Sequence, residues 1–100
     1  MTDSNFTIGF IGLGLIGGSI AKGIRRVFPN YTLIGMDENP DTIKSALEDG
    51  IIDSIATDCK TDFAECNYVF LCAPVQYNVM YLKDLKASIN ENCILTECRK

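Results

Sequence analysis

The start of the chain changes from a compact apolar run to helical spacing across a group of glycines. Residues 8–11 form the apolar run, which predicts a short buried strand. Beyond the glycines, apolar side chains recur about every four residues and so share one face of a helix. They are Ile16, Ile20, Ile24 and Val27. Because Pro29 cannot continue a helix, we expect this one to end at Phe28.

The rest of the chain alternates further strand and helix patterns. We expect strands at residues 31–36, 54–57, 68–73 and 93–96, and helices at 40–49, 61–65 and 76–89. The helix that starts at Pro40 has the clearest end signals, since Asn39 can cap its first turn and Gly50 can end it. The run at 68–73 is unbroken rather than alternating, which predicts a central strand covered on both faces.

This alternation of strands and helices predicts an α/β fold in which right-handed crossovers build a parallel sheet. The expected strand order is 3-2-1-4-5, that of a Rossmann-type doubly wound sheet, and 100 residues provide a single domain. Ligands of such sheets bind beyond the carboxyl ends of the strands, at the point where the order reverses. We therefore expect residues 72–76 to lie beside residues 12–17.

Gly12, Gly14 and Gly17 stand in the G-x-G-x-x-G register between the first strand and the first helix. In this motif the first glycine permits a tight turn, the second has no Cβ to hold a pyrophosphate away, and the third lets the helix pack closely. The unpaired N–H groups and the dipole at the helix start can then bind phosphates without a basic side chain. The alternative is a glycine-rich turn that serves only helix packing.

Asp37 follows the second predicted strand and lies twenty positions beyond Gly17. A carboxylate there can accept hydrogen bonds from the hydroxyls of an adenine ribose, and it would repel a 2′-phosphate. Glu38 comes next, where enzymes that use the phosphorylated cofactor commonly place an arginine. These two acids predict NAD rather than NADP as the cofactor. The alternative is that Asp37 only caps a turn.

Composition narrows the classes of function that remain. The formal charge of −4 and the isoelectric point near 4.6 argue against a nucleic-acid or anionic-membrane surface. The basic cluster of Lys22, Arg25 and Arg26 falls near the end of the first helix, where we expect a solvated face. Apolar runs are too short for a membrane span and the start lacks a basic signal region, so we expect a cytoplasmic protein.

The cysteines predict free thiols rather than a metal centre or disulfides. They are five in number, none forms a C-x-x-C pair, and the chain contains no histidine. Free thiols suit a reducing compartment, and without histidine we expect no catalytic cysteine. Cys72 and Cys93 fall in predicted buried strands, where cysteine acts as a small hydrophobe.

The predicted helix at 76–89 carries more apolar surface than one stripe requires. Val79, Leu82, Leu85 and Ile89 mark the stripe, and Tyr77, Met80 and Tyr81 widen it. We expect this extra surface to pack on the sheet. Contact with another domain or a second subunit is the alternative.

Three segments together carry a family resemblance. Residues 9–21, 35–40 and 70–75 are G-F-I-G-L-G-L-I-G-G-S-I-A, G-M-D-E-N-P and F-L-C-A-P-V. They resemble the N-terminal domain of prephenate dehydrogenases and of their close relatives, the arogenate dehydrogenases. Gly17-Gly18-Ser19 is more typical of this family than of hydroxyisobutyrate or phosphogluconate dehydrogenases. The resemblance extends over about residues 6–96.

The resemblance implies oxidative decarboxylation of prephenate to 4-hydroxyphenylpyruvate, on the way to tyrosine, with hydride passing to NAD. It assigns the pyrophosphate turn to Gly12, Gly14, Leu15, Ile16 and Gly17. It assigns the adenine ribose to Asp37, and the far side of the cofactor to Ala73, Pro74 and Val75. All of these are binding roles, and none is catalytic.

The end of the chain departs from the family pattern. The family continues with T-D-x-x-S-x-K, a histidine that contacts substrate, and a helical dimerisation domain, whereas here Glu97-Cys98-Arg99-Lys100 follows Thr96. We therefore expect a truncated cofactor-binding domain of an enzyme that is a homodimer at full length, unable to turn over prephenate alone. The alternatives are a domain of an arogenate or other hydroxyacid dehydrogenase, or a stand-alone nucleotide-binding or sensor module.

Overall fold

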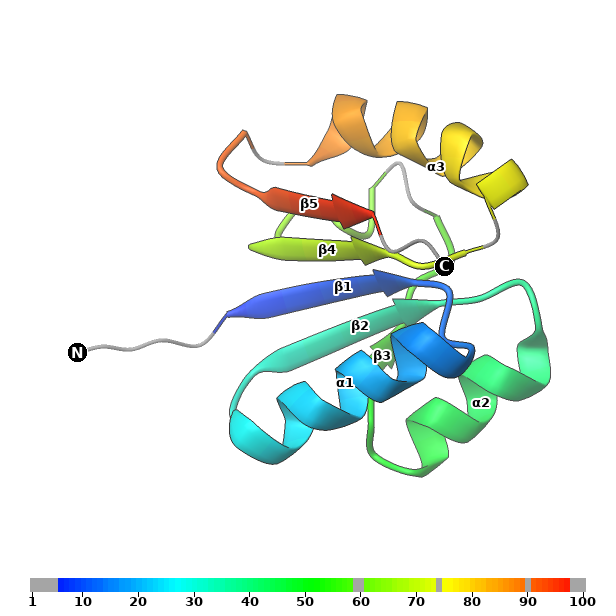
Figure 1. The fold of residues 1–100 in the computed structure, drawn as a ribbon. Coiled ribbons are helices and arrows are strands. Elements are labelled where there is room, and N and C mark those ends of the chain that lie inside the picture. Colours follow the sequence, from blue (N-terminus) through cyan, green and yellow to red (C-terminus); the bar gives the residue numbers. More distant parts are fainter. Residues whose placement is uncertain (1–5, 59–60, 74, 90, 98–100) are drawn as a thin grey trace.

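The computed structural model describes residues 6–58, 61–73, 75–89 and 91–97. Its elements, in chain order, are β1 (Thr7–Ile11), α1 (Leu15–Val27), β2 (Thr32–Met36), α2 (Pro40–Glu48), β3 (Ser54–Ile55), β4 (Tyr68–Leu71), α3 (Val75–Ser88) and β5 (Ile94–Glu97). The five strands form one parallel sheet in the order β3-β2-β1-β4-β5 (Figure 1). The predicted α/β class and strand order are confirmed.

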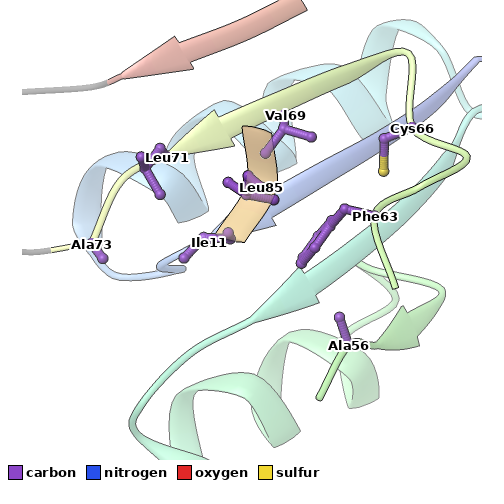
Figure 2. Close-up of a cluster of buried hydrophobic side chains, with 8 residues drawn as sticks. All are labelled: Ile11, Ala56, Phe63, Cys66, Val69, Leu71, Ala73 and Leu85. Atoms are coloured by element: carbon purple, nitrogen blue, oxygen red, sulfur yellow. The ribbon is translucent and has the colours of Figure 1, made fainter. Parts of the chain in front are cut away.

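The helices form two layers, with α1 and α2 on one face of the sheet and α3 on the other (Figure 1). Each face buries its own apolar cluster. The cluster on the α1 and α2 face contains Ile8, Phe10, Leu13, Ala21, Leu33, Ile43, Ala46 and Ile52. Figure 2 shows the cluster on the α3 face, which consists of Ile11, Ala56, Phe63, Cys66, Val69, Leu71, Ala73 and Leu85. Here Leu85 comes from α3, and Phe63 and Cys66 come from the connection between β3 and β4.

The strand register brings three chain segments to the same edge of the sheet. Ile11, the last residue of β1, pairs with Met36 at the end of β2 and with Leu71 at the end of β4. Because the strands are parallel, the residues that follow them emerge side by side. The glycine turn, Asp37 and residues 72–73 therefore meet at the carboxyl edge, as the sequence predicts.

Several predicted element ends are confirmed by local hydrogen bonds. The α1 helix stops before Phe28, whose N–H still donates to the Ile24 carbonyl at 2.7 Å. At the start of α2, the Asn39 side chain accepts the Asp41 N–H at 2.9 Å. Gly50 follows α2 with φ +74°, a left-handed conformation that favours glycine.

The brief helix predicted at residues 61–65 is wrong, because this segment forms turns. Asp62 explains the difference. Its carboxylate accepts the Thr57 N–H at 2.8 Å and the Asp58 N–H at 3.0 Å. These bonds to backbone N–H groups lower the pKa of Asp62 and fold the chain back on itself in place of a helical ladder.

The prediction that β4 is covered on both faces is also only half right. Val69 and Leu71 are buried beneath α3, whereas Tyr68 and Phe70 on the other face are half-buried. The reason is that α1 and α2 lie over the β1, β2 and β3 side (Figure 1), so the cluster on this face covers Phe70 only in part. The Phe70 ring stacks on that of Phe10, with ring centroids 5.3 Å apart. Cys72 and Cys93 likewise lie just outside their strands and are half-buried, not inside a buried strand.

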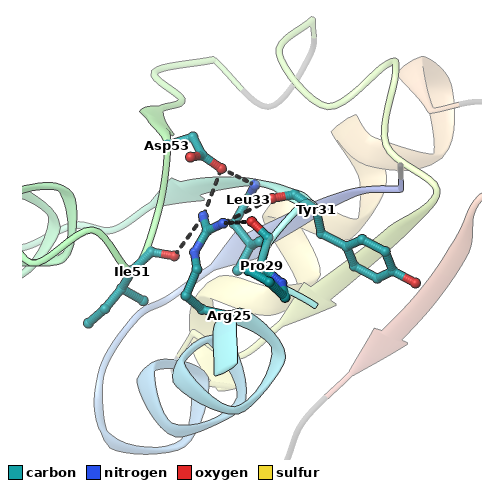
Figure 3. Close-up of polar contacts among 6 residues, drawn as sticks. All are labelled: Arg25, Pro29, Tyr31, Leu33, Ile51 and Asp53. Atoms are coloured by element: carbon teal, nitrogen blue, oxygen red, sulfur yellow. Dashed lines mark hydrogen bonds and ion pairs between the residues drawn. The ribbon is translucent and has the colours of Figure 1, made fainter. Parts of the chain in front are cut away.

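Arg25 does not lie on a solvated helix face as expected. Figure 3 shows its guanidinium turned back from α1 to bridge separate segments. It donates to the carbonyls of Pro29 (3.2 Å), Tyr31 (3.0 Å) and Ile51 (3.3 Å), and to the Asp53 carboxylate (2.7 Å). The end of α1 is thereby fixed to the start of β2 and to the approach to β3.

Candidate functional site

Gly12 leaves β1 in a conformation that places the backbones of three strands in contact. Its φ is +94°, and its N–H donates to the Met36 carbonyl of β2 at 2.8 Å. A Cβ at this position would lie 2.6 Å from the Ala73 backbone nitrogen and 2.7 Å from the Cys72 carbonyl carbon. Both the left-handed φ and the approach of the β4 exit therefore require glycine here.

Gly17 lets α1 pack on the turn that precedes it. It is buried in the helix, and a Cβ there would lie 2.1 Å from the Gly12 carbonyl oxygen. No side chain fits at that distance. The helix-packing role predicted for the third glycine of the motif is therefore confirmed.

Gly14 differs from both, because no contact with the described residues calls for a glycine there. It is exposed, its φ is −71°, and a Cβ would meet no atom within 4 Å among the described residues. It is the N-cap of α1, and no side chain of the described residues caps this helix start. An open space thus lies in front of the first turn of α1.

The first turn of α1 presents hydrogen-bond donors and contains no acidic side chain of its own. The first helical hydrogen bond runs from the Gly18 N–H to the Gly14 carbonyl at 2.8 Å, so the N–H groups of residues 15–17 have no partner within the helix. No acidic residue lies in this turn. Such a helix start favours an anion.

Leu15 and Ile16 border this open helix start. Their exposed fractions are 87 % and 37 %, which places them among the exposed large apolar residues of the domain. Ile16 therefore does not belong to the buried face of α1, nor does Val27 at 64 % exposure. Ile20 and Ile24 do pack against the core, as predicted.

Asp37 joins the end of β2 to the glycine turn. Its Oδ2 accepts the Leu13 N–H at 2.6 Å, and its Oδ1 accepts the Asn39 N–H at 2.8 Å. The turn-capping role is thus confirmed. Each carboxylate oxygen has about two acceptor positions, so one on each remains available for a ligand hydroxyl. The predicted contact with a ribose stays a prediction.

A cavity of about 190 Å³ opens at the carboxyl edge of the sheet beside Asp37. Its lining residues come from the ends of β1, β2 and β4 and from α3: Ile11, Gly12, Met36, Asp37, Glu38, Asn39, Ala73 and Tyr81. Gly12, Asp37 and Ala73 of the predicted site thus share this cavity, whereas the predicted residues 14–17 lie at the adjoining helix start. Val75 begins α3, and Pro74 lies outside the described residues.

Tyr81 and Glu38 form a contact at this cavity that the sequence did not reveal. The Tyr81 hydroxyl donates to the Glu38 Oε2 at 2.5 Å, which ties α3 to the loop after β2. Tyr81 also packs on the apolar cluster beneath α3, as predicted, whereas the same prediction is wrong for Met80, which is 66 % exposed, and the side chain of Tyr77 lies outside the described ones. Helical periodicity indicates that a residue is near the sheet but not which edge it reaches, so no sequence signal identified this pair.

Among the described residues, no helix is long and apolar enough to cross a membrane. The described residues also contain no group of three histidine, cysteine, aspartate or glutamate side chains that could hold a metal ion.

The sequence matches a known family over most of its length. Residues 20–99 match the family model for the nucleotide-binding domain of prephenate dehydrogenase. A prephenate dehydrogenase of Bacillus subtilis (strain 168) is 34 % identical over 98 residues, a match that covers 97 % of this chain and 26 % of that protein. The chain thus spans about a quarter of the length of this curated relative.

Solved structures give the same result. A prephenate dehydrogenase of Aquifex aeolicus, in complex with hydroxyphenyl propionate and NAD+, superposes with a TM-score of 0.84 at 31 % identity over 97 % of this chain and 34 % of that one. An arogenate dehydrogenase of Synechocystis gives a TM-score of 0.82 at 31 % identity over 93 % of this chain and 32 % of that one. From the family match, the identities and the shared fold, we conclude that the chain belongs to the prephenate dehydrogenase family and corresponds to its nucleotide-binding domain.

Proposed function

We propose that this domain binds NAD+ along the carboxyl edge of the sheet. The observation that carries the proposal is Gly14, a glycine in front of an open helix start that neither packing nor a left-handed φ requires. A ligand that approaches the helix start closely needs a residue without a Cβ at this position. The Aquifex aeolicus relative, whose structure is a complex with NAD+, supports the same cofactor.

The proposal gives ligand-binding roles to residues 14–17, to Asp37 and to residues 73–75. The N–H groups at the start of α1, over residues 14–17, donate to the pyrophosphate, and Leu15 and Ile16 flank it. The Asp37 carboxylate accepts hydrogen bonds from the adenine ribose while it keeps its two backbone bonds. The proposal assigns the far side of the cofactor to Ala73, Pro74 and Val75, which follow β4 in the sequence.

In the longer enzyme we propose oxidative decarboxylation of prephenate to 4-hydroxyphenylpyruvate in tyrosine biosynthesis. NAD+, when bound, supplies the acceptor for the hydride. The family match and the relative bound to hydroxyphenyl propionate support prephenate as substrate. Arogenate is the second candidate, because an arogenate dehydrogenase is as similar in sequence as the prephenate enzyme.

The proposal extends to the organisation of the whole protein. We place the proton-transferring histidine and the substrate-binding groups in a helical domain beyond these 100 residues, which also forms a homodimer in the cytoplasm. The relatives are three to four times as long as this chain, which leaves room for such a domain. The 100-residue chain is then expected to form no NADH from prephenate and NAD+. A measurable rate of NADH formation would refute the assignment of proton transfer and substrate binding to another domain.

Amide chemical-shift mapping tests the cofactor site directly. NAD+ is titrated into the 15N-labelled chain, and the method detects binding even at millimolar dissociation constants. We expect the largest shifts at the amides of residues 12–17 and at Asp37, with small shifts at Tyr31 and Asp53 near the opposite edge. Shifts confined to other residues would overturn the proposed site.

A further inference from the structure

The Tyr81–Glu38 hydrogen bond spans the cavity from one layer of the fold to another. Tyr81 lies in α3 and is half-buried, whereas Glu38 lies in the loop between β2 and α2 and is exposed. Both residues line the cavity. At 2.5 Å between oxygens, the bond has the length of a hydroxyl donating to a charged carboxylate.

The cavity has a strongly one-sided charge. Asp37 and Glu38 contribute two carboxylates, and the described residues that line the cavity include no lysine or arginine. Asp37 is held in place by two backbone N–H groups. Glu38 has a longer side chain in an exposed loop, so without a partner its carboxylate would distribute over several rotamers, most of them away from the cavity.

We infer that Tyr81 is a positioning residue that holds the Glu38 carboxylate at the cavity and so weakens binding of a dinucleotide with a 2′-phosphate. This inference rests on the proposed NAD+ site. With both carboxylates fixed at the adenosine end, a phosphate on the ribose meets two like charges and no lysine or arginine among the described residues that line the cavity. Unphosphorylated NAD+ carries only hydroxyl groups on this ribose. The Tyr81–Glu38 bond therefore weakens binding of the phosphorylated cofactor and so increases the preference for NAD+.

The rival explanation is a purely structural tie between α3 and the loop after β2. Such a tie would affect both cofactors alike and would not depend on ionic strength. A positioned charge acts only on the phosphorylated cofactor, and salt screens its effect because Glu38 is exposed. The ratio of the two dissociation constants and its salt dependence therefore separate the explanations.

The experiment compares Tyr81→Phe with the unaltered 100-residue chain by calorimetric or chemical-shift titration with NAD+ and with NADP+. Phenylalanine keeps the ring on the apolar cluster and removes only the hydroxyl. Tyr31→Phe makes the same change just before β2, whereas the cavity lies at the other end of that strand, beyond Met36, and it serves as the matched control. The variants Glu38→Gln and Tyr81→Phe with Glu38→Gln complete a double-mutant cycle.

We expect Tyr81→Phe to leave the NAD+ dissociation constant within about twofold and to tighten NADP+ binding by about three- to fivefold, the size of one charge contact across water. The gain should vanish at 1 M salt, where the Debye length is about 3 Å. It should also vanish in the Glu38→Gln background. Tyr31→Phe should change neither constant.

An unchanged ratio of the NAD+ and NADP+ dissociation constants in Tyr81→Phe, in a chain that binds NAD+, would overturn the role of Tyr81 and leave the proposed function standing. A gain that persists at 1 M salt or in the Glu38→Gln background would also overturn it, in favour of the structural tie. Failure of the unaltered chain to bind NAD+ at all would overturn the proposed function together with this inference.

Discussion

Replacing Arg25 with methionine tests how the end of α1 is held to the sheet. Methionine retains an apolar stem of similar length and removes the guanidinium. Four acceptors lose a donor: the carbonyl groups of Pro29, Tyr31 and Ile51, and the Asp53 carboxylate (Figure 3). We expect the chain to fold with a lower free energy of unfolding.

The size of this loss follows from the exposure of each bond. The bonds to Tyr31 and Ile51 are part-buried and contribute about 1 kcal/mol each. The bonds to Pro29 and to Asp53, whose side chain is 48 % exposed, contribute about 0.5 kcal/mol each after screening by solvent. The Arg25 Nε is buried and has no hydrogen-bond partner among the described residues, so its removal returns about 1 kcal/mol. The net expectation is a loss of about 2 kcal/mol.

Part of this loss depends on pH through Asp53. Burial raises the pKa of Asp53, but the Leu33 N–H and the Arg25 guanidinium together outweigh burial and leave the pKa below its ordinary value. A lowered pKa in the folded state stabilises the fold above the ordinary pKa, and that contribution is lost as the pH falls through the folded value. The stability difference between the chain and Arg25→Met should therefore be full at pH 7 and narrow below about pH 4.

Urea unfolding at pH 7 measures the loss. With an m-value of about 1.3 kcal/mol/M, the midpoint should fall by about 1.5 M. Arg26→Met provides the control, because Arg26 is the neighbouring residue on α1 and is exposed, and its midpoint should stay within about 0.4 M. If the two variants unfold at the same urea concentration, the bridging role assigned to Arg25 is wrong.

Three further predictions concern the site and the core. Gly17→Ala should cost about 1–3 kcal/mol in urea unfolding, since its Cβ would lie 2.1 Å from the Gly12 oxygen, and an unaltered midpoint would contradict the close packing. Asp37→Ser should narrow the ratio of NADP+ to NAD+ dissociation constants by about tenfold in calorimetry; if the ratio holds, Asp37 only caps a turn. Burial raises the pKa of Cys66 to about 12, so iodoacetamide at pH 8 should leave it unmodified in peptide mapping, unlike in the urea-unfolded chain. Equal labelling in both states would contradict its burial.

The features that local chemistry determines were predictable from the sequence. The glycine turn, the Asn39 cap and the stop before Pro29 each depend on neighbouring residues, and the alternation of elements then restricts the strand order to one expected arrangement. The meeting of the glycine turn with Asp37 follows from the same topology. Fold and site location were accordingly predicted together.

Contacts between distant side chains were not predictable in this way. The partners of Arg25 lie at positions 29, 31, 51 and 53, and Glu38 lies 43 residues before Tyr81. Neither charge pattern nor periodicity specifies such pairs. Each contact joins a helix side chain to a loop, and it depends on where the folded chain places that loop. The turns at 61–65 were missed for a related reason, since a carboxylate of one side chain replaced the helical ladder.

The open helix start at Gly14 provides the most direct test of NAD+ binding by this domain. Gly14→Ala adds a Cβ where no atom lies within 4 Å, so its stability should change by less than about 1 kcal/mol. Gly23→Ala adds the same methyl group to an equally open position further along α1, and should stabilise the helix by up to about 1 kcal/mol.

The decisive measurement is the NAD+ dissociation constant of these two variants beside that of the unaltered chain, by calorimetry. We predict that Gly23→Ala binds NAD+ as the unaltered chain does and that Gly14→Ala binds at least about tenfold more weakly, because its Cβ occupies the approach to the helix start. Equal affinity in Gly14→Ala and Gly23→Ala would contradict the placement of the pyrophosphate at the start of α1.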